Sequence, residues 1–143
     1  MKLDELRVYE LAMELGEIVY QMVARWDIFA KDTVGKQWVR SMDSVAANLS
    51  EGFGRFHYKE SKHYCYYARG SLFESKTWAT KAHKRNLISP EQFNDFMKKI
   101  DATGIKLNNY IRTIGPTGKS DCVKESTELY GTTWENNDAP QGQ

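Results

Sequence analysis

Apolar side chains recur every three or four residues in four separate segments of the chain, which is the spacing of one face of an α-helix. These segments cover residues 4–26, 33–52, 58–85 and 90–114. The last one repeats without a break in steps of four and three, the pattern of a coiled-coil seam, at Phe93, Met97, Ile100, Gly104, Leu107, Ile111 and Ile114. Four amphipathic helices with short connections predict an all-α fold, an antiparallel up-down-up-down four-helix bundle.

Residues that favour helix ends separate the segments. Asp32 or Thr33 is suited to cap the second helix, and the glycines in 52–54 predict its end, because glycine accepts the left-handed backbone conformation. Asn86 is suited to end the third helix, and residues 89–92 (Ser-Pro-Glu-Gln) predict a capping box with proline at the first helical position.

After residue 116 the chain is rich in Gly, Thr, Ser, Asn and acidic residues, and no apolar period is sustained. We therefore expect two parts, a four-helix bundle over residues 1–116 and a flexible polar and acidic tail, mostly irregular, over residues 117–143. No stretch approaches the roughly 18 apolar residues of a membrane span, and the acidic start is no secretion signal, so we expect a cytoplasmic protein without a membrane role.

The net charge of +1 hides a strong asymmetry along the chain. Residues 1–32 carry 4 basic and 7 acidic residues, a net of −3, and residues 117–143 carry 2 and 5, again −3. Residues 55–85 carry 8 basic and 2 acidic residues, a net of +6. Near-neutrality therefore does not exclude a polyanion as partner, because a partner meets one face rather than the whole chain. The acidic tail is also able to compete for the basic segment.

The third helix is predicted to alternate cations with aromatic rings on one outward face. At about 100° per residue, seven positions fall within about 80° of one another: Lys62, Tyr66, Arg69, Phe73, Lys76, Thr80 and Lys84. The inward stripe of the same helix is predicted to be Tyr64, Tyr67 or Ala68, Ser71 or Leu72, Ser75, Trp78 or Ala79, and Ala82.

Three interpretations of the outward face remain open. Cations neutralise phosphates and aromatic rings stack on unpaired bases, so the face is suited to nucleic acid. Alternatively, Tyr66 and Phe73 are buried in an oligomer interface, where the cations meet the acidic first helix of a neighbouring subunit. The third interpretation is a solvated surface. The candidate residues for binding nucleic acid or a partner are Arg55, Lys59, Lys62, Tyr66, Arg69, Phe73 and Lys76.

No motif predicts an enzyme, a cofactor or a metal site. Residues 115–120 (Gly-Pro-Thr-Gly-Lys-Ser) place two residues where a phosphate-binding loop has four, and they follow a helix. The pair Glu60 and His63 has the spacing used in di-metal bundles, but a second copy is missing. Asp43 and Asn48 lie near the apolar stripe of the second helix and are expected to be satisfied polar groups inside the bundle.

Three blocks of the sequence resemble a known family. They are Leu-Arg-Val-Tyr at residues 6–9, Val-Ala-Ala-Asn-Leu-Ser-Glu-Gly-Phe-Gly-Arg at residues 45–55, and Gly-Ser-Leu-Phe-Glu at residues 70–74. The second block is similar to the pattern I-P-x-N-I-A-E-G-x-G-R, with Ala46 in place of proline. The chain thus resembles, over about residues 3–115, the four-helix-bundle family named for proteins encoded in intervening sequences of 23S ribosomal RNA genes.

The resemblance implies a left-handed bundle assembled as a homopentamer, without established enzymatic activity or catalytic residues. It also implies that residues 51–55 form a helix terminus and turn that fixes the second and third helices. A related branch, the accessory proteins of diversity-generating retroelements, forms positively charged pentameric barrels that bind a reverse transcriptase and nucleic acid. The expected function is therefore a non-enzymatic homo-oligomer that binds RNA, DNA or a nucleic-acid enzyme such as a reverse transcriptase. The alternative is a purely structural or protein-binding oligomer.

Overall fold

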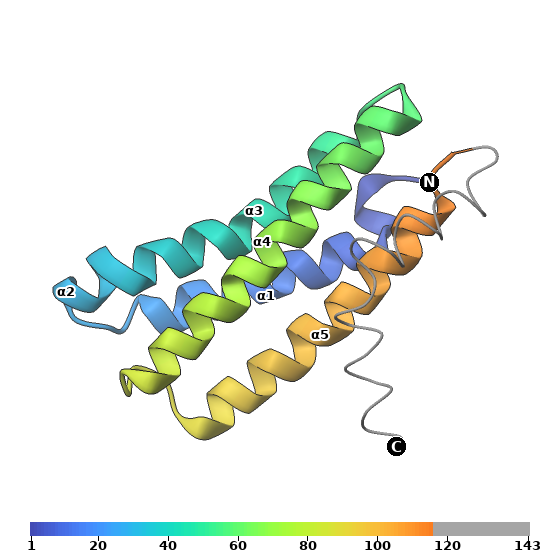
Figure 1. The fold of residues 1–143 in the computed structure, drawn as a ribbon. Helices are drawn as coiled ribbons and strands as arrows, with labels where there is room; N and C mark the ends of the chain where they lie inside the picture. The colour runs from blue at the N-terminus through green and yellow to red at the C-terminus, as the bar shows by residue number, and fades with distance from the viewer. Residues whose placement is uncertain (116–143) are drawn as a thin grey trace, which may run out of the picture.

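The computed structural model describes residues 1–115, and this part of the chain is helical, with no strands (Figure 1). Its four long helices are α1 (Arg7–Val23), α3 (Lys36–Phe53), α4 (Tyr58–Lys84) and α5 (Pro90–Thr113). Three short elements precede α1 or α3: η1 (Leu3–Glu5), α2 (Ile28–Ala30) and η2 (Lys31–Gly35). The predicted all-α class is confirmed. The predicted tail lies outside the described residues, and so does the stretch after Gly115 that was compared with a phosphate-binding loop.

The long helices are joined at alternating ends of the molecule, so that each reverses the direction of the one before it (Figure 1). Helix α3 contacts α1 and α4, and α5 contacts α4 and α1, which closes a ring of four helices around one core. All four long helices contribute fully buried core side chains, among them Val19 of α1, Trp38, Met42 and Leu49 of α3, Leu72 of α4, and Ile100, Leu107 and Ile111 of α5. Burying each such side chain stabilises the bundle by about 1.5–3 kcal/mol.

The second helical segment begins earlier than the sequence predicts. Asp27, rather than Asp32 or Thr33, is the N-cap, and its Oδ1 accepts a hydrogen bond of 2.9 Å from the Ala30 N–H. The chain then passes through the π-helical turn η2 directly into α3. A Cβ at Gly35 would lie 2.7 Å from Cγ1 of Val23, so this glycine lets the turn lie close against the end of α1.

The α3–α4 turn does not use a left-handed glycine. Gly54 has φ −81°, an ordinary right-handed value, so that part of the prediction is wrong. Gly52 is required for a different reason: a Cβ there would lie 2.9 Å from Cβ of Tyr64 and 3.0 Å from the carbonyl oxygen of Ser61. The glycine therefore permits close approach of α3 and α4.

The α4–α5 turn forms as predicted. Asn86 has φ 59°, the left-handed conformation that asparagine tolerates at a helix end. The Gln92 N–H donates to Oγ of Ser89 at 3.0 Å, and the Ser89 N–H donates to Oε1 of Gln92 at 2.9 Å, which completes the capping box before Pro90. Within the described residues, no helix combines the length and the apolar character needed to cross a membrane.

Candidate nucleic-acid interface

The face of α4 that the sequence places outward is turned toward α5. Arg69 is only 1% exposed, and its Nη1 donates to Oδ1 of Asn108 on α5. Nζ of Lys76 lies 2.8 Å from Oδ1 of Asp101 on α5. Tyr66 and Phe73 are half-buried, packed against the hydrophobic core. The prediction that Tyr66, Arg69, Phe73 and Lys76 lie on an outward face of the bundle is therefore wrong.

The buried stripe of α4 explains this rotation. Much of it consists of small residues, Ala68, Ser75, Ala79 and Ala82, together with Cys65 and Leu72. Small side chains let α3 approach closely, and the larger residues beside the stripe then fill the space toward α5. The Arg69 guanidinium lies 5.7 Å from the ring centroid of Phe73, a cation–π distance, and Asn108 supplies a polar acceptor for its buried charge.

A different stripe of α4 faces solvent. Beyond the first turn, its exposed positions step by four and three: His63, Tyr67, Gly70, Glu74, Thr77, Lys81 and Lys84, in line with Lys59 in the first turn. At about 100° per residue this stripe is rotated by roughly a quarter turn from the predicted face. With Glu60, which is also exposed in the first turn, the exposed surface of α4 carries three lysines against two glutamates and is still basic. The expected inward position of Tyr67 is corrected by the same observation.

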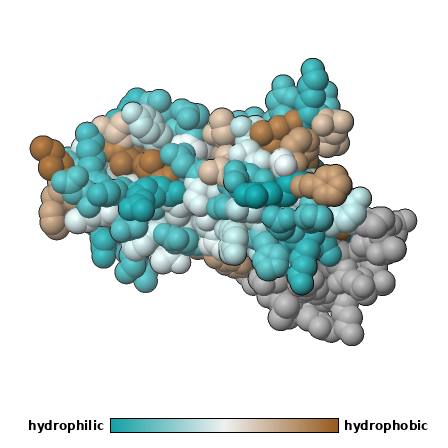
Figure 2. Space-filling model, turned by 90° about the horizontal axis from the view of Figure 1, so that it is seen from above, coloured by the Kyte–Doolittle hydropathy of each residue, from teal (hydrophilic) through white to brown (hydrophobic). Residues whose placement is uncertain are grey.

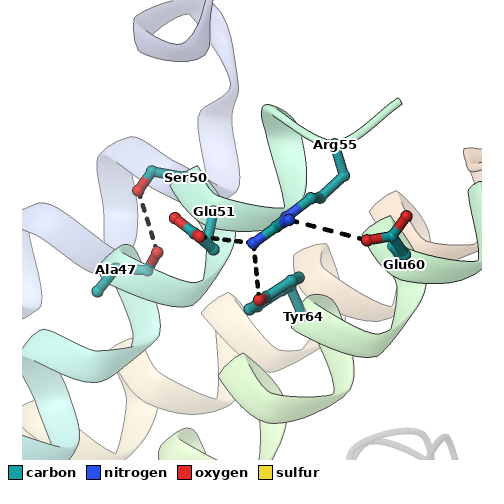
Figure 3. Close-up of polar contacts among 6 residues, drawn as sticks. All are labelled: Ala47, Ser50, Glu51, Arg55, Glu60 and Tyr64. Carbon is teal, nitrogen blue, oxygen red and sulfur yellow. Dashed lines mark hydrogen bonds and ion pairs between the residues drawn. The ribbon is translucent and has the colours of Figure 1, made fainter. Parts of the chain in front are cut away.

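Arg55 ties the end of α3 to the start of α4 (Figure 3). Its Nη2 donates to Oε1 of Glu51 at 2.8 Å and to Oη of Tyr64 at 2.9 Å, while its Nη1 lies 3.8 Å from Oε2 of Glu60. The guanidinium carbon lies 4.9 Å from the Tyr64 ring centroid. Tyr64, followed by the two carboxylates, raises the pKa of Arg55. The cluster is built around the turn at residues 51–55. The family resemblance implied that these residues form a turn that fixes the second and third helices.

Beside this cluster lies a pocket of 540 Å³, which we call the turn pocket, lined by His57, Lys59, Glu60, His63, Tyr64 and Tyr67. The Tyr67 side chain is 57% exposed, and its ring meets Tyr64 edge-to-face, with centroids 5.8 Å apart and planes at 85°. Phe56, 91% exposed, and the exposed Tyr58 stand in the same turn region. Of the predicted residues, the structure places Arg55 and Lys59 here, and the half-buried Lys62 one turn further along α4.

The aromatic residues of this turn were not among the binding residues predicted from the sequence. The signal that points to them is the density of aromatic rings between residues 56 and 67, next to Arg55 and Lys59.

A second hollow of 400 Å³ lies between α4 and α5, and its lining includes Lys76, Lys81, Lys84 and Met97. The exposed cations of α4 thus border two concave surfaces.

The residues considered for catalysis take other roles. Glu60 faces Arg55, and within residues 1–115 no three or more His, Cys, Asp or Glu side chains gather where they could hold a metal ion. Asn48 is half-buried and donates to the carbonyl oxygen of Ser44 at 2.9 Å. Asp43 is exposed rather than inside the bundle, and partial burial followed by the charge of Glu17 raises the pKa of its carboxyl.

The comparison with protein families agrees with the geometry of the bundle. The model of the 23S rRNA-intervening sequence protein family matches residues 4–109, which run from the start of the first helix through most of α5 and include the α3–α4 turn. A comparison with curated proteins found no match.

Proposed function

Because the chain belongs to the 23S rRNA-intervening sequence protein family, we propose that it binds nucleic acid through the exposed cations of α4 and of the α3–α4 turn. It does so as a cytoplasmic, non-enzymatic protein. The observation that carries this proposal is the exposed surface of α4, which presents Lys59, Lys81 and Lys84 against Glu60 and Glu74, with Glu60 facing Arg55.

The stripe fits a long polyanion better than a small anionic ligand. Lys59 lies near one end of α4 and Lys81 and Lys84 near the other, with 25 residue steps or about 38 Å of helix from first to last, so the cations are not gathered at one point. Spread cations bind through neutralisation of successive phosphates and release of counterions. Arg55 contributes to the same potential from the turn, while its donors hold Glu51 and Tyr64. The resemblance to the accessory proteins of diversity-generating retroelements supports the same ligand, and a reverse transcriptase is a partner of the same class.

A salt titration tests the proposal. For single-stranded RNA, the slope of log K against log salt is about 0.7 per phosphate contact. Replacing three exposed lysines of the stripe by glutamine (Lys59→Gln, Lys81→Gln and Lys84→Gln together) is expected to lower that slope by about 2. The matched control removes three exposed lysines elsewhere, Lys36, Lys98 and Lys106.

Equal slopes for the two triple variants would contradict the assignment of the stripe. The absence of any binding of RNA or DNA at about 50 mM salt, where phosphate contacts are strongest, would refute nucleic-acid binding itself.

The second candidate function is self-assembly without a nucleic-acid role. Ile28 and Phe29 are 76% and 79% exposed, at the end of the bundle that carries α2. Figure 2 shows hydrophobic residues at that left end and again toward the right end, with a mostly hydrophilic middle. Gly70 adds an open position in mid-helix, since nothing lies within 4 Å of a Cβ built there. A homo-oligomer would cover such surfaces.

Sedimentation of the Gly70→Gln variant tests self-assembly. The longer side chain leaves the isolated bundle intact and blocks close approach of a neighbour, so an oligomer that uses this face is expected to shift toward monomer. Thr77→Gln, two turns further along the same exposed stripe, is the control. A monomeric wild type would count against self-assembly, and an unchanged oligomer in Gly70→Gln would count against use of this face of α4. Sedimentation of the wild type also gives the number of subunits, which the family resemblance implies to be five.

A further inference from the structure

We infer that the turn pocket receives one unpaired base of a single-stranded nucleic acid, with Tyr67 as the stacking surface. The inference rests on the proposed nucleic-acid binding and goes beyond it, because phosphate contacts alone do not distinguish a single strand from a duplex. The pocket volume of 540 Å³ lies within the range of about 300–1,000 Å³ that is typical of sites for small organic groups.

The ring of Tyr67 is available and its neighbour is fixed. Tyr64 is held by the hydrogen bond from Arg55 at 2.9 Å and by the guanidinium 4.9 Å from its ring centroid. Tyr64 therefore forms a fixed wall, against which the Tyr67 ring stands edge-to-face with more than half of its side chain exposed. Stacking of a base on an exposed ring tolerates any base identity, because every base has a π-face.

One cation of the pocket is placed to meet a phosphate. Lys59 and Glu60 both line the pocket, but the carboxylates of Glu51 and Glu60 face Arg55, at 2.8 and 3.8 Å. Among the described residues, no carboxylate lies within ion-pair distance of Lys59. A nucleotide places its base on Tyr67 and its phosphate near Lys59, and so uses both kinds of side chain.

Single-strand preference follows from the stacking geometry. In a duplex each base is stacked and paired, and presenting one to the pocket requires its extrusion at the cost of that pairing and stacking. A single strand presents its bases without that cost. A duplex carries the higher charge density, so preference for the single strand cannot arise from phosphate contacts alone.

The test compares three fluorescently labelled RNA probes with the full chain by anisotropy: a single strand, its duplex, and the same strand with abasic sites. The single strand is expected to bind at least about fivefold tighter than either of the others, the lower end of what one stacked base contributes. Tyr67→Ala is expected to lose this difference, and Tyr67→Phe to retain it because the ring remains. Tyr20→Ala removes a tyrosine of similar exposure, 52%, from α1, and is expected to bind like wild type.

The outcomes distinguish the base pocket from the proposed phosphate binding by the lysines. Equal binding of the three probes, or full single-strand preference in Tyr67→Ala, refutes the base pocket while leaving phosphate binding by the lysines in place. Loss of preference in both Tyr67→Ala and Tyr67→Phe refutes stacking as the mechanism. Failure of all three probes to bind at about 50 mM salt overturns the pocket and the proposed function together.

Discussion

Gly52 lies where α3 and α4 are in close contact, and its replacement by alanine tests that packing directly. An alanine Cβ would lie 2.9 Å from Cβ of Tyr64 and 3.0 Å from the carbonyl oxygen of Ser61, where ordinary contacts are 3.4–4 Å. Neither atom lies at the end of a flexible side chain, so no rotamer change relieves the overlap. The two helices must instead move apart.

The expected loss follows from two opposing effects. Overpacking at an interface that cannot adjust costs about 3 kcal/mol, the upper end of the usual range. Alanine in place of glycine inside a helix returns about 1 kcal/mol. The net loss in free energy of unfolding is then about 2 kcal/mol, which for a bundle of this size lowers Tm by about 8 °C.

Urea unfolding followed by far-UV circular dichroism measures this loss, and Gly70→Ala is the matched control. Gly70 is also a glycine inside a helix, but nothing lies within 4 Å of its Cβ position. Its replacement is expected to raise the free energy of unfolding by about 1 kcal/mol through helix propensity alone. If Gly52→Ala proves as stable as Gly70→Ala, propensity is the only effect at both positions and the close approach is refuted.

Three further substitutions test other parts of the structure. Asp27→Ala removes the cap on the Ala30 N–H and is expected to lower stability by about 1 kcal/mol in urea unfolding. Asn108→Leu removes an oxygen that accepts a hydrogen bond from the buried Arg69 and is expected to lower stability by about 2 kcal/mol, the range for a hydrogen bond to a charged group. Asp43→Asn is expected to raise stability at neutral pH, because a raised pKa means that the folded state disfavours the ionised carboxyl.

Each of these has an outcome that would contradict it. The raised pKa of Asp43 makes its ionised form destabilising above that pKa, so the gain in Asp43→Asn must shrink as the pH falls toward 4; a constant gain would assign it to another cause. Asp32→Ala is the control for the cap, and equal losses there would restore Asp32 as the start of the helix. Asn109→Leu, at an exposed position, should cost less than the change at its neighbour Asn108.

The buried face of a helix is predicted most reliably from the sequence where large aliphatic residues form one stripe along that helix. In α5 the repeat in steps of four and three leads to the fully buried Ile100, Leu107 and Ile111. The capping box at Ser89 is equally local, because its hydrogen bonds join residues three apart. The start of the second segment was missed because Ile28 and Phe29, which follow the true cap, are exposed and do not continue the apolar period.

Helix α4 shows why a binding face is harder to predict than a helix. Its buried stripe includes Ala68, Ser75, Ala79 and Ala82, while rings and long cations occupy both flanks, so residue size and polarity do not define which flank is inside. The position of α5 decides which flank of α4 lies inside, because it places Asn108 and Asp101 opposite Arg69 and Lys76.

The exposed stripe of α4 is rotated by about a quarter turn from the predicted face, and this difference changes the chemistry of the surface more than its charge. Arg69, whose guanidinium is the group suited to bidentate phosphate contacts, is a buried structural group, and Lys59, Lys81 and Lys84 carry the positive charge at the surface of α4. Lysines bind phosphate as point charges and carry little base or shape preference, so they favour general affinity for polyanions. Any discrimination between nucleic acids must then come from the rings near the α3–α4 turn, where the exposed ring of Tyr67 lines the pocket that Arg55 and Tyr64 hold in shape.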